Sequence, residues 1–374
     1  MREPRSSVRS RGDDGRGHAR ATADPGSLAT AGPNPALTES RWTVRRATDA
    51  RAYELADGLW CLRLPLRFVA PRSVNAYLFA LADGYCLVDC GTSLEPGWSA
   101  LEYAFGLAGV EPGELKLLVC THLHADHAGL GAEVVARTGC EFARGAGPAT
   151  PDHQLRDPHV PASERRRRAL REGIPEAAIA EWVGAEPDDD LEYAEVKPHR
   201  LLTAGDEIVG TTGAWTVVPA PGHSPTQILL HDPARRYLIM ADLAYDVGDP
   251  FFEYGSTPDP YAEHLASIDR ALELDAALAF PGHGRVVESP RHRLTVARAA
   301  AQSSRTRVLD ALSTTQPKSV YELAVELLGP REDPGERQSM ISIVLCIAEH
   351  LVGHELAATE IGPDGIRRFR RVGT

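Results

Sequence analysis

The sequence of 374 residues is short of several features that define whole classes of protein. Its six cysteines form no Cys-x-x-Cys pair and no dense framework, which excludes a disulfide scaffold and predicts reduced, buried thiols. No apolar run approaches the roughly 18 residues of a transmembrane helix. The N-terminus carries arginines without a following apolar segment, which argues against a secretory signal. We therefore expect a cytoplasmic protein without membrane association.

Positive charge is also in deficit, because 40 Lys and Arg stand against 52 Asp and Glu, a formal net charge of −12. A chain this acidic has no general attraction to nucleic acid, although a local basic patch can still provide one. Hydrophobic residues make up 43% and charged residues 25%, which are ordinary values for a globular protein. Histidine is plentiful, with 14 copies against three methionines, and this indicates metal or acid–base chemistry.

Composition divides the chain into three expected parts. Residues 1–45 are rich in Arg, Ser, Gly, Ala and Pro without apolar periodicity, which predicts a disordered tail. Residues 46–290 hold short apolar runs that predict strands, first alone and then mixed with helices, and this order favours an α+β layered sandwich. Pro-rich loops and two expected helices interrupt the pattern over 148–200, which indicates a helical insertion. Residues 291–374 are expected to form a small C-terminal domain.

The expected elements follow from apolar periodicity and turn residues. An Asp-Gly pair at 83–84 predicts a hairpin, and Ser319 with Glu322 predicts a capping box. Three late helices and a terminal hairpin form the winged-helix pattern. The expected strands are 59–62, 76–80, 85–88, 115–120, 215–218, 228–230, 237–240, 276–280, 356–359 and 366–372, and the expected helices include 98–107, 132–137, 175–182, 260–274, 320–328 and 337–351.

One short segment carries a dense set of potential metal ligands directly after the expected strand 115–120. It contains His122, His124, Asp126 and His127. Imidazole nitrogen and carboxylate oxygen are donors that bind divalent zinc. His122 and His124 can converge on one ion, while Asp126 and His127 face another direction. The spacing therefore indicates a site for two metals.

Three further candidates lie downstream, each after an apolar run: His223, Asp242 and His283. Glycines precede His223 and His283 and allow the backbone to turn tightly. Ligands placed at strand ends form a rigid, open cup at one edge of a sheet.

With these motifs in this order, residues 50–290 resemble the metallo-β-lactamase superfamily. The resemblance implies a four-layer αββα sandwich with the metal site at the sheet edges, and places an expected lid at the insertion 148–200. Asp89 matches the family's Asp-x-Gly motif and is expected to support the site from behind. The resemblance assigns His122, His124 and His223 to the first metal, Asp126, His127 and His283 to the second, and Asp242 as the bridge between them.

Departures from individual subfamilies narrow the expected activity. True β-lactamases of this fold usually lack the bridging carboxylate, so Asp242 argues against antibiotic hydrolysis. The flavodiiron branch carries Glu at the position of His124, which favours two Zn²⁺ per chain, with Fe or Mn as alternatives. The short interval between Asp242 and His283 has no room for the insertion typical of the family's nucleases. We expect a hydrolase of a small ester, thioester or lactone, with Asp126 orienting the nucleophilic water.

The substrate pocket and the C-terminal domain leave alternatives open. Four aromatic residues after Asp242 either line an acyl pocket or pack in the core: Tyr245, Phe251, Phe252 and Tyr254. The run 349–351 resembles the winged helix of one lactamase-like subgroup, some of whose members cleave single-stranded RNA. Arginines on the expected wing can meet phosphates: Arg367, Arg368, Arg370 and Arg371. An RNA endonuclease and a DNA-binding regulator are therefore the alternatives, and the module can also serve as a homodimer contact.

Overall fold

The computed structural model describes residues 45–56, 58–67, 71–147, 162–183, 196–244, 251–252, 254–255, 257–329 and 334–373. These residues all belong to one compact unit, Arg41–Thr374. Residues 1–44 of the expected tail and the expected pocket residue Tyr245 lie outside the described residues. None of the described helices combines the length and hydropathy of a membrane span.

The first sheet has seven strands in chain order: β1 Arg51–Ala56, β2 Leu59–Pro65, β3 Ser73–Leu81, β4 Gly84–Val88, β5 Leu115–Cys120, β6 Glu141–Gly145 and β7 Arg200–Leu202. The first four strands pair antiparallel, and β4 to β7 pair parallel. The Asp-Gly hairpin is confirmed, because Leu81 of β3 pairs with Gly84 of β4. Because β4 and β5 are parallel, their carboxyl ends lie at the same edge of the sheet.

The second sheet has five strands: β8 Glu207–Val209, β9 Ala214–Pro219, β10 Ile228–Asp232, β11 Tyr237–Ala241 and β12 Leu278–Pro281. Their order is β12-β11-β10-β9-β8, and β11 and β12 pair parallel while the other pairs are antiparallel. Phe79, Trp215 and Phe280 pack between the two sheets, each almost fully buried. Burying one such side chain stabilises the fold by roughly 1.5 to 3 kcal/mol.

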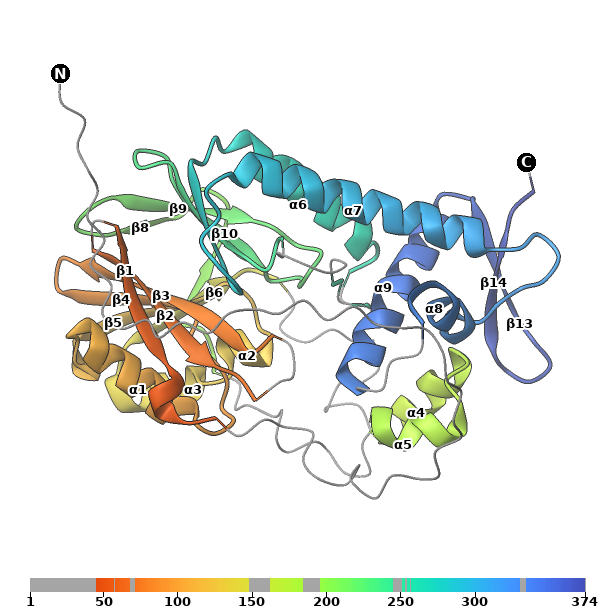
Figure 1. Ribbon diagram of the computed structural model, residues 1–374, viewed down its shortest axis with the longest axis horizontal. Coiled ribbons are helices and arrows are strands. Elements are labelled where there is room, and N and C mark those ends of the chain that lie inside the picture. The colour runs from red at the N-terminus through yellow and green to blue at the C-terminus, as the bar shows by residue number, and fades with distance from the viewer. Residues whose placement is uncertain are drawn as a thin grey trace, which may run out of the picture. The chain divides into compact units, whose positions relative to one another are not determined.

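Helices cover the outer face of each sheet, which confirms the four-layer αββα sandwich (Figure 1). Helices α1 Gly97–Ala108 and α3 Gly131–Thr138 pack on the first sheet, and α6 Pro260–Glu273 and α7 Pro290–Ala311 pack on the second. The short helix α2 Ala125–Ala128 follows β5, and two 3₁₀ turns occupy Ala47–Asp49 and Pro112–Glu114.

The C-terminal module has the predicted order of helices and hairpin: α7, α8 Val320–Leu328, α9 Pro334–Gly353, β13 Ala357–Ile361 and β14 Arg367–Arg371. Its capping box is confirmed, since Glu322 N donates to Ser319 Oγ at 3.2 Å and Ser319 N donates to the Glu322 carboxylate at 2.7 Å. Helix α7 lies along α6 and also contacts α8 and α9 (Figure 1). The winged-helix identification stays a prediction.

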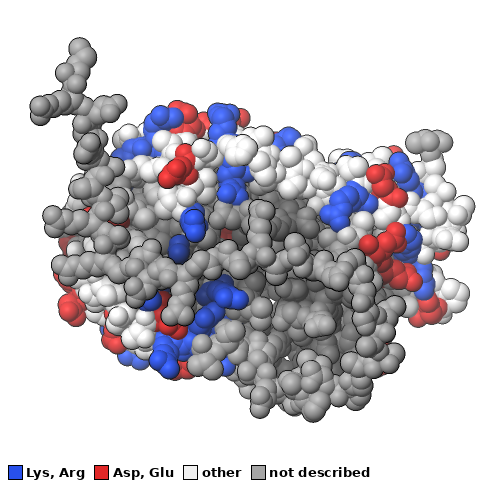
Figure 2. Space-filling view, in the orientation of Figure 1, with Lys and Arg blue, Asp and Glu red and all other residues white. Residues whose placement is uncertain are grey.

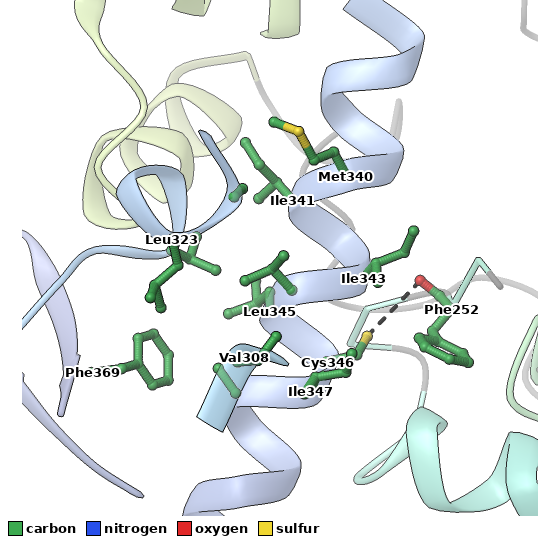
Figure 3. Close-up of a cluster of buried hydrophobic side chains, with 14 of the residues drawn as sticks. Phe252, Val308, Leu323, Met340, Ile341, Ile343, Leu345, Cys346, Ile347 and Phe369 are labelled. Atoms are coloured by element: carbon green, nitrogen blue, oxygen red, sulfur yellow. Dashed lines mark hydrogen bonds between the residues drawn. The ribbon is translucent and has the colours of Figure 1, made fainter. Parts of the chain in front are cut away.

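The described part of the insertion packs on this C-terminal module. It forms α4 Ala162–Arg171 and α5 Glu176–Val183, whose neighbours in Figure 1 are α8 and α9. Its residues Ala169, Ile174 and Ile179 join the apolar cluster around α9 that Figure 3 shows. Residues 148–161 and 184–195 lie outside the described residues. The role of the insertion as a lid stays a prediction.

Candidate metal centre

The structure brings all seven predicted metal-site residues together at one edge of the sandwich. Each follows the carboxyl end of a strand: the cluster from His122 to His127 follows β5, and the three later residues follow β9, β11 and β12. His122 and His127 are fully buried, and His223 and Asp242 nearly so. Because these strands belong to both sheets, the sandwich itself fixes the site.

The first group consists of three imidazoles whose nitrogens face one another. His124 Nδ1 lies 3.1 Å from His122 Nε2 and 3.0 Å from His223 Nε2. The three donor atoms fall within 4.8 Å of one another, a spacing that one metal ion can bridge. This is the set that the sequence predicted for the first metal.

The second group combines a carboxylate with two imidazoles. His283 Nε2 lies 3.2 Å from Asp126 Oδ2 and 3.4 Å from His127 Nε2. The third edge of the triangle, from His127 Nε2 to Asp126 Oδ2, measures 3.9 Å. This set matches the second predicted metal position.

Asp242 lies between the two groups. Its Oδ1 is 3.4 Å from His127 Nε2, and its Oδ2 is 3.3 Å from His283 Nε2. The same Oδ2 is 3.7 Å from His223 Nε2, which belongs to the first group. Asp242 is therefore placed where one carboxylate can face two ions.

Asp89 lies directly behind His127, as predicted. Its Oδ2 accepts a hydrogen bond from His127 Nδ1 at 2.8 Å, and both its oxygens accept from Thr121, from the backbone N at 2.7 Å and from Oγ1 at 2.9 Å. Asp89 adopts a left-handed backbone conformation with φ of 62°, which Asp tolerates better than most residues. The bond to Nδ1 leaves His127 Nε2 as the nitrogen that faces the cluster.

Three other imidazoles are held in the same way through Nδ1. His122 Nδ1 lies 3.0 Å from Thr121 Oγ1, and His283 Nδ1 donates to the Ser73 carbonyl at 2.8 Å. His223 Nδ1 donates to the Phe251 carbonyl at 3.3 Å. An outer partner on Nδ1 turns each Nε2 toward the centre, which is the arrangement of metal-ligating histidines. The donor set thus fits divalent metal ions.

The electrostatics of the first group favour neutral rings. Burial lowers the pKa of His122 and His223 well below the usual value, and neighbouring imidazoles lower it further. Neutral imidazole is the form that ligates metals.

The second group shows the opposite balance. Burial lowers the pKa of His283, but Asp242 and Asp126 outweigh it and raise this pKa to about 10. For Asp126 the signs are reversed. Burial raises the pKa of its carboxyl, but His127 and His283 outweigh burial and hold this pKa well below its usual value. The ionised carboxylates of Asp126 and Asp242 attract positive charge. A divalent cation can supply this charge in place of protons on the histidines.

Two strand-end glycines leave room for the ligands. A Cβ at Gly282 would overlap Asp242 Oδ1 and come within 2.6 Å of His127 Cε1. Gly222 has φ of +122°, and a Cβ there would overlap the backbone of His264. Only glycine therefore lets these two turns bring His283 and His223 to the centre.

Sequence reasoning missed the residues that hold the His283 turn. Asn75 Nδ2 donates to the Pro281 carbonyl at 2.9 Å, and Tyr77 OH donates to the same carbonyl at 2.5 Å. Both lie on β3, so they join the two sheets beside the site. A polar Asn inside the apolar run of this strand is the signal that could have identified one of them.

The expected pocket aromatics separate in space. The ring of Phe251 lies edge-on to His124 and His223, with centroids 5.8 Å and 5.5 Å away. Phe252 is fully buried in the cluster around α9, and Tyr254 is half-buried beside it. Among the described residues of this set, Phe251 is thus the one that borders the candidate metal centre.

The sequence of the chain is similar to those of known proteins. The model of the metallo-beta-lactamase superfamily matches residues 69–283, more than half of the chain. The chain is 25% identical over 285 residues to the probable metallo-hydrolase YqjP of Bacillus subtilis, covering 71% of this chain and 83% of that protein. It is 26% identical over 306 residues to the acyl-coenzyme A thioesterase MBLAC2 of Homo sapiens, covering 75% and 96%.

A solved structure shows the same fold. The beta-lactamase domain protein from Burkholderia ambifaria superimposes with a TM-score of 0.74 at 23% identity. The match covers 90% of this chain and 97% of that one, so the shared fold extends beyond residues 69–283.

Proposed function

Since this chain belongs to the metallo-beta-lactamase superfamily and is a hydrolase of that superfamily, we propose that it cleaves small acyl thioesters with two divalent metal ions. The observation that carries the proposal is the convergence of five imidazoles and two carboxylates at one sheet edge. We assign Zn²⁺ as the native metal, because nitrogen-rich sites of this kind suit it. Iron and manganese are the alternatives for the same residues.

The proposed ligand sets follow the two groups of the structure. His122, His124 and His223 would hold the first ion, and Asp126, His127 and His283 the second. Asp242 would contact both. Zinc, when bound, lowers the pKa of a coordinated water and polarises a carbonyl oxygen.

Asp126 is the proposed catalytic residue. Its side chain is 15% exposed, and His127 and His283 keep the pKa of its carboxyl well below the usual value. An ionised, partly accessible carboxylate can accept a hydrogen bond from a water molecule and orient it for attack.

The thioester substrate class is supported by the human relative, which is named an acyl-coenzyme A thioesterase and is matched over 96% of its length. The Phe251 ring beside His124 and His223 offers an apolar surface for the acyl chain. Esters and lactones present the same carbonyl chemistry and belong in the same screen.

The arginines of β14 do not favour an RNA or DNA substrate. Arg367 is buried and paired with Glu172 and Glu349, and Arg368 pairs with Asp364 at 2.6 Å. On the face in Figure 2, basic and acidic side chains lie interspersed over the C-terminal module. Arg367 and Arg368 are thus already paired with carboxylates of the chain, so we do not advance nucleic-acid binding as a second function.

The test is release of free thiol from acyl-coenzyme A by the Zn²⁺-loaded protein, followed with a thiol reagent. Asp126→Ala should reduce kcat by at least about a hundredfold while the fold is retained. Glu133→Ala, on the exposed face of α3, is the control and should keep wild-type turnover. Undiminished turnover in Asp126→Ala, or no hydrolysis of any thioester, ester or lactone by the loaded wild type, would contradict the proposal.

A further inference from the structure

Helix α9 of the C-terminal module reaches the wall of the candidate metal centre through Ser342. Its Oγ donates to the Phe252 carbonyl at 2.6 Å and accepts from Tyr254 N at 3.2 Å. Ser342 is 8% exposed, and its hydrogen bond to the Phe252 carbonyl is buried. One buried hydroxyl thus fixes two backbone groups of the segment that follows Asp242.

Other contacts of Phe252 hold the same segment. Cys346, one helical turn after Ser342, donates through Sγ to the Phe252 carbonyl at 3.9 Å (Figure 3). The Phe252 ring packs against Tyr261 and His264 of α6, with centroids 5.7 Å and 5.0 Å away. Phe252 is therefore anchored between α6 and α9.

The neighbouring residue, Phe251, makes the contacts with the metal centre. Its carbonyl accepts the Nδ1 hydrogen bond of His223, and its ring lies against His223 and His124. One peptide unit separates this carbonyl from Phe252. The Phe251 carbonyl belongs to the planar peptide that ends at Phe252 Cα, so a shift of that Cα moves this carbonyl.

We propose that Ser342 is a positioning residue for the metal centre, acting through Phe252 and Phe251 on His223. The inference rests on the proposed function for its activity readout, whereas its metal-binding readout needs no substrate. Without the hydroxyl, the Phe252 carbonyl loses a buried donor and Tyr254 N loses its acceptor, and the backbone shifts to find other partners. His223 then loses its fixed acceptor and its aim at the first ion.

A matched pair of variants isolates the hydroxyl. Ser342→Thr and Ser342→Val introduce side chains of nearly equal size, so their packing costs are similar. We expect the Val variant to bind Zn²⁺ on the order of tenfold more weakly than the Thr variant in competition with a chromogenic chelator. The kcat for a thioester should fall by a similar factor with KM little changed. If the Val variant does not fold, Ser342→Ala takes its place in the comparison.

Ser319→Ala is the control for general loss of stability. It removes the N-cap of α8 in the same module, where Ser319 Oγ accepts from Glu322 N, and such a change typically costs about 1 kcal/mol. Its Zn²⁺ affinity should equal that of wild type. Equal affinity in the Thr and Val variants overturns the proposal, as does an equal loss in Ser319→Ala. A wild type that binds Zn²⁺ without cleaving thioesters overturns the proposed function alone.

Discussion

The hydrogen bonds of Asp89 predict what its replacement does to metal binding. Its Oδ2 accepts from His127 Nδ1, and its left-handed backbone is one that Asn also adopts readily. Both oxygens of Asp89 accept hydrogen bonds, whereas Asn has one oxygen and one NH2 group. Asp89→Asn therefore keeps the shape but sets a donor against either His127 Nδ1 or the Thr121 backbone N. We expect Zn²⁺ affinity to fall by about 10- to 100-fold with the fold retained, as measured by chelator competition.

Asp275→Asn provides the control for this change, because Asp275 also has positive φ, at 48°, but a solvent-exposed side chain. Its affinity should stay at the wild-type value. Wild-type affinity in Asp89→Asn would show that the carboxylate does not orient His127.

His264 makes the stability of the fold sensitive to acid. It is 1% exposed, both its ring nitrogens lack a hydrogen-bond partner within the described part of the chain, and burial lowers its pKa to about 4. An unfolded histidine titrates near 6.5, so as the pH falls from about 6.5 to 4 the unfolded chain binds a proton that the folded chain excludes. Stability therefore decreases through this window.

His264→Leu should remove this component. Urea unfolding of the metal-free proteins at pH 7 and pH 4.5 should show a loss of stability smaller by about 2 to 3 kcal/mol in the variant than in wild type. The same loss in both proteins would mean that His264 takes up its proton in the folded state.

Side chains with their own metal chemistry were predictable, and so was Asp89 from its motif, whereas the backbone partners of the other ligands were not. Residue type and spacing identify His122, His124 and Asp126 as candidate ligands. The carbonyls of Ser73 and Phe251 belong to a backbone that every residue shares, so no sequence pattern marks them. Their roles depend on which segments the fold brings beside His283 and His223.

The contact between the insertion and β14 depends on one buried arginine. Arg367 pairs with Glu172, which follows α4, at 2.9 Å and with Glu349 of α9. Burial lowers the pKa of Arg367, but the two carboxylates outweigh it and raise this pKa above its usual value. Arg367→Met should cost about 3 to 5 kcal/mol of unfolding free energy, because it leaves the buried Glu172 carboxylate without its cation.

Arg368→Met, one residue along the same strand, is the matched control. Its partner Asp364 is largely exposed, so the loss should stay below about 1 kcal/mol. Urea denaturation of both variants measures the difference. Similar small losses would show that the Arg367 charges are accessible to water.

Elements with strong local signals were predictable to within a residue or two. The run 115–120 coincides with β5, and the capping box predicted α8. Strands β1, β6, β7 and β8 were not predicted, and β7 and β8 have three residues each, too few to show an alternating pattern. The packing of α4 on the C-terminal module also left no local signal, since Glu172 and Arg367 lie 195 residues apart.

The whole molecule joins a sandwich that presents the ligands to a C-terminal module that supports one side of them. Strand ends of both sheets carry the seven residues, and α9 holds the segment at His223. In this arrangement the C-terminal module supports the metal centre, a role that requires no nucleic-acid binding.

The most direct test of the central claim is the number of metal ions that the metal-free protein binds, measured by native mass spectrometry during Zn²⁺ titration. We predict two ions per chain for wild type and a weakened, incomplete occupancy for Asp242→Ala, which removes the carboxylate between the two groups. A wild type that binds no Zn²⁺, or an Asp242→Ala variant that binds two ions as tightly as wild type, would contradict the account.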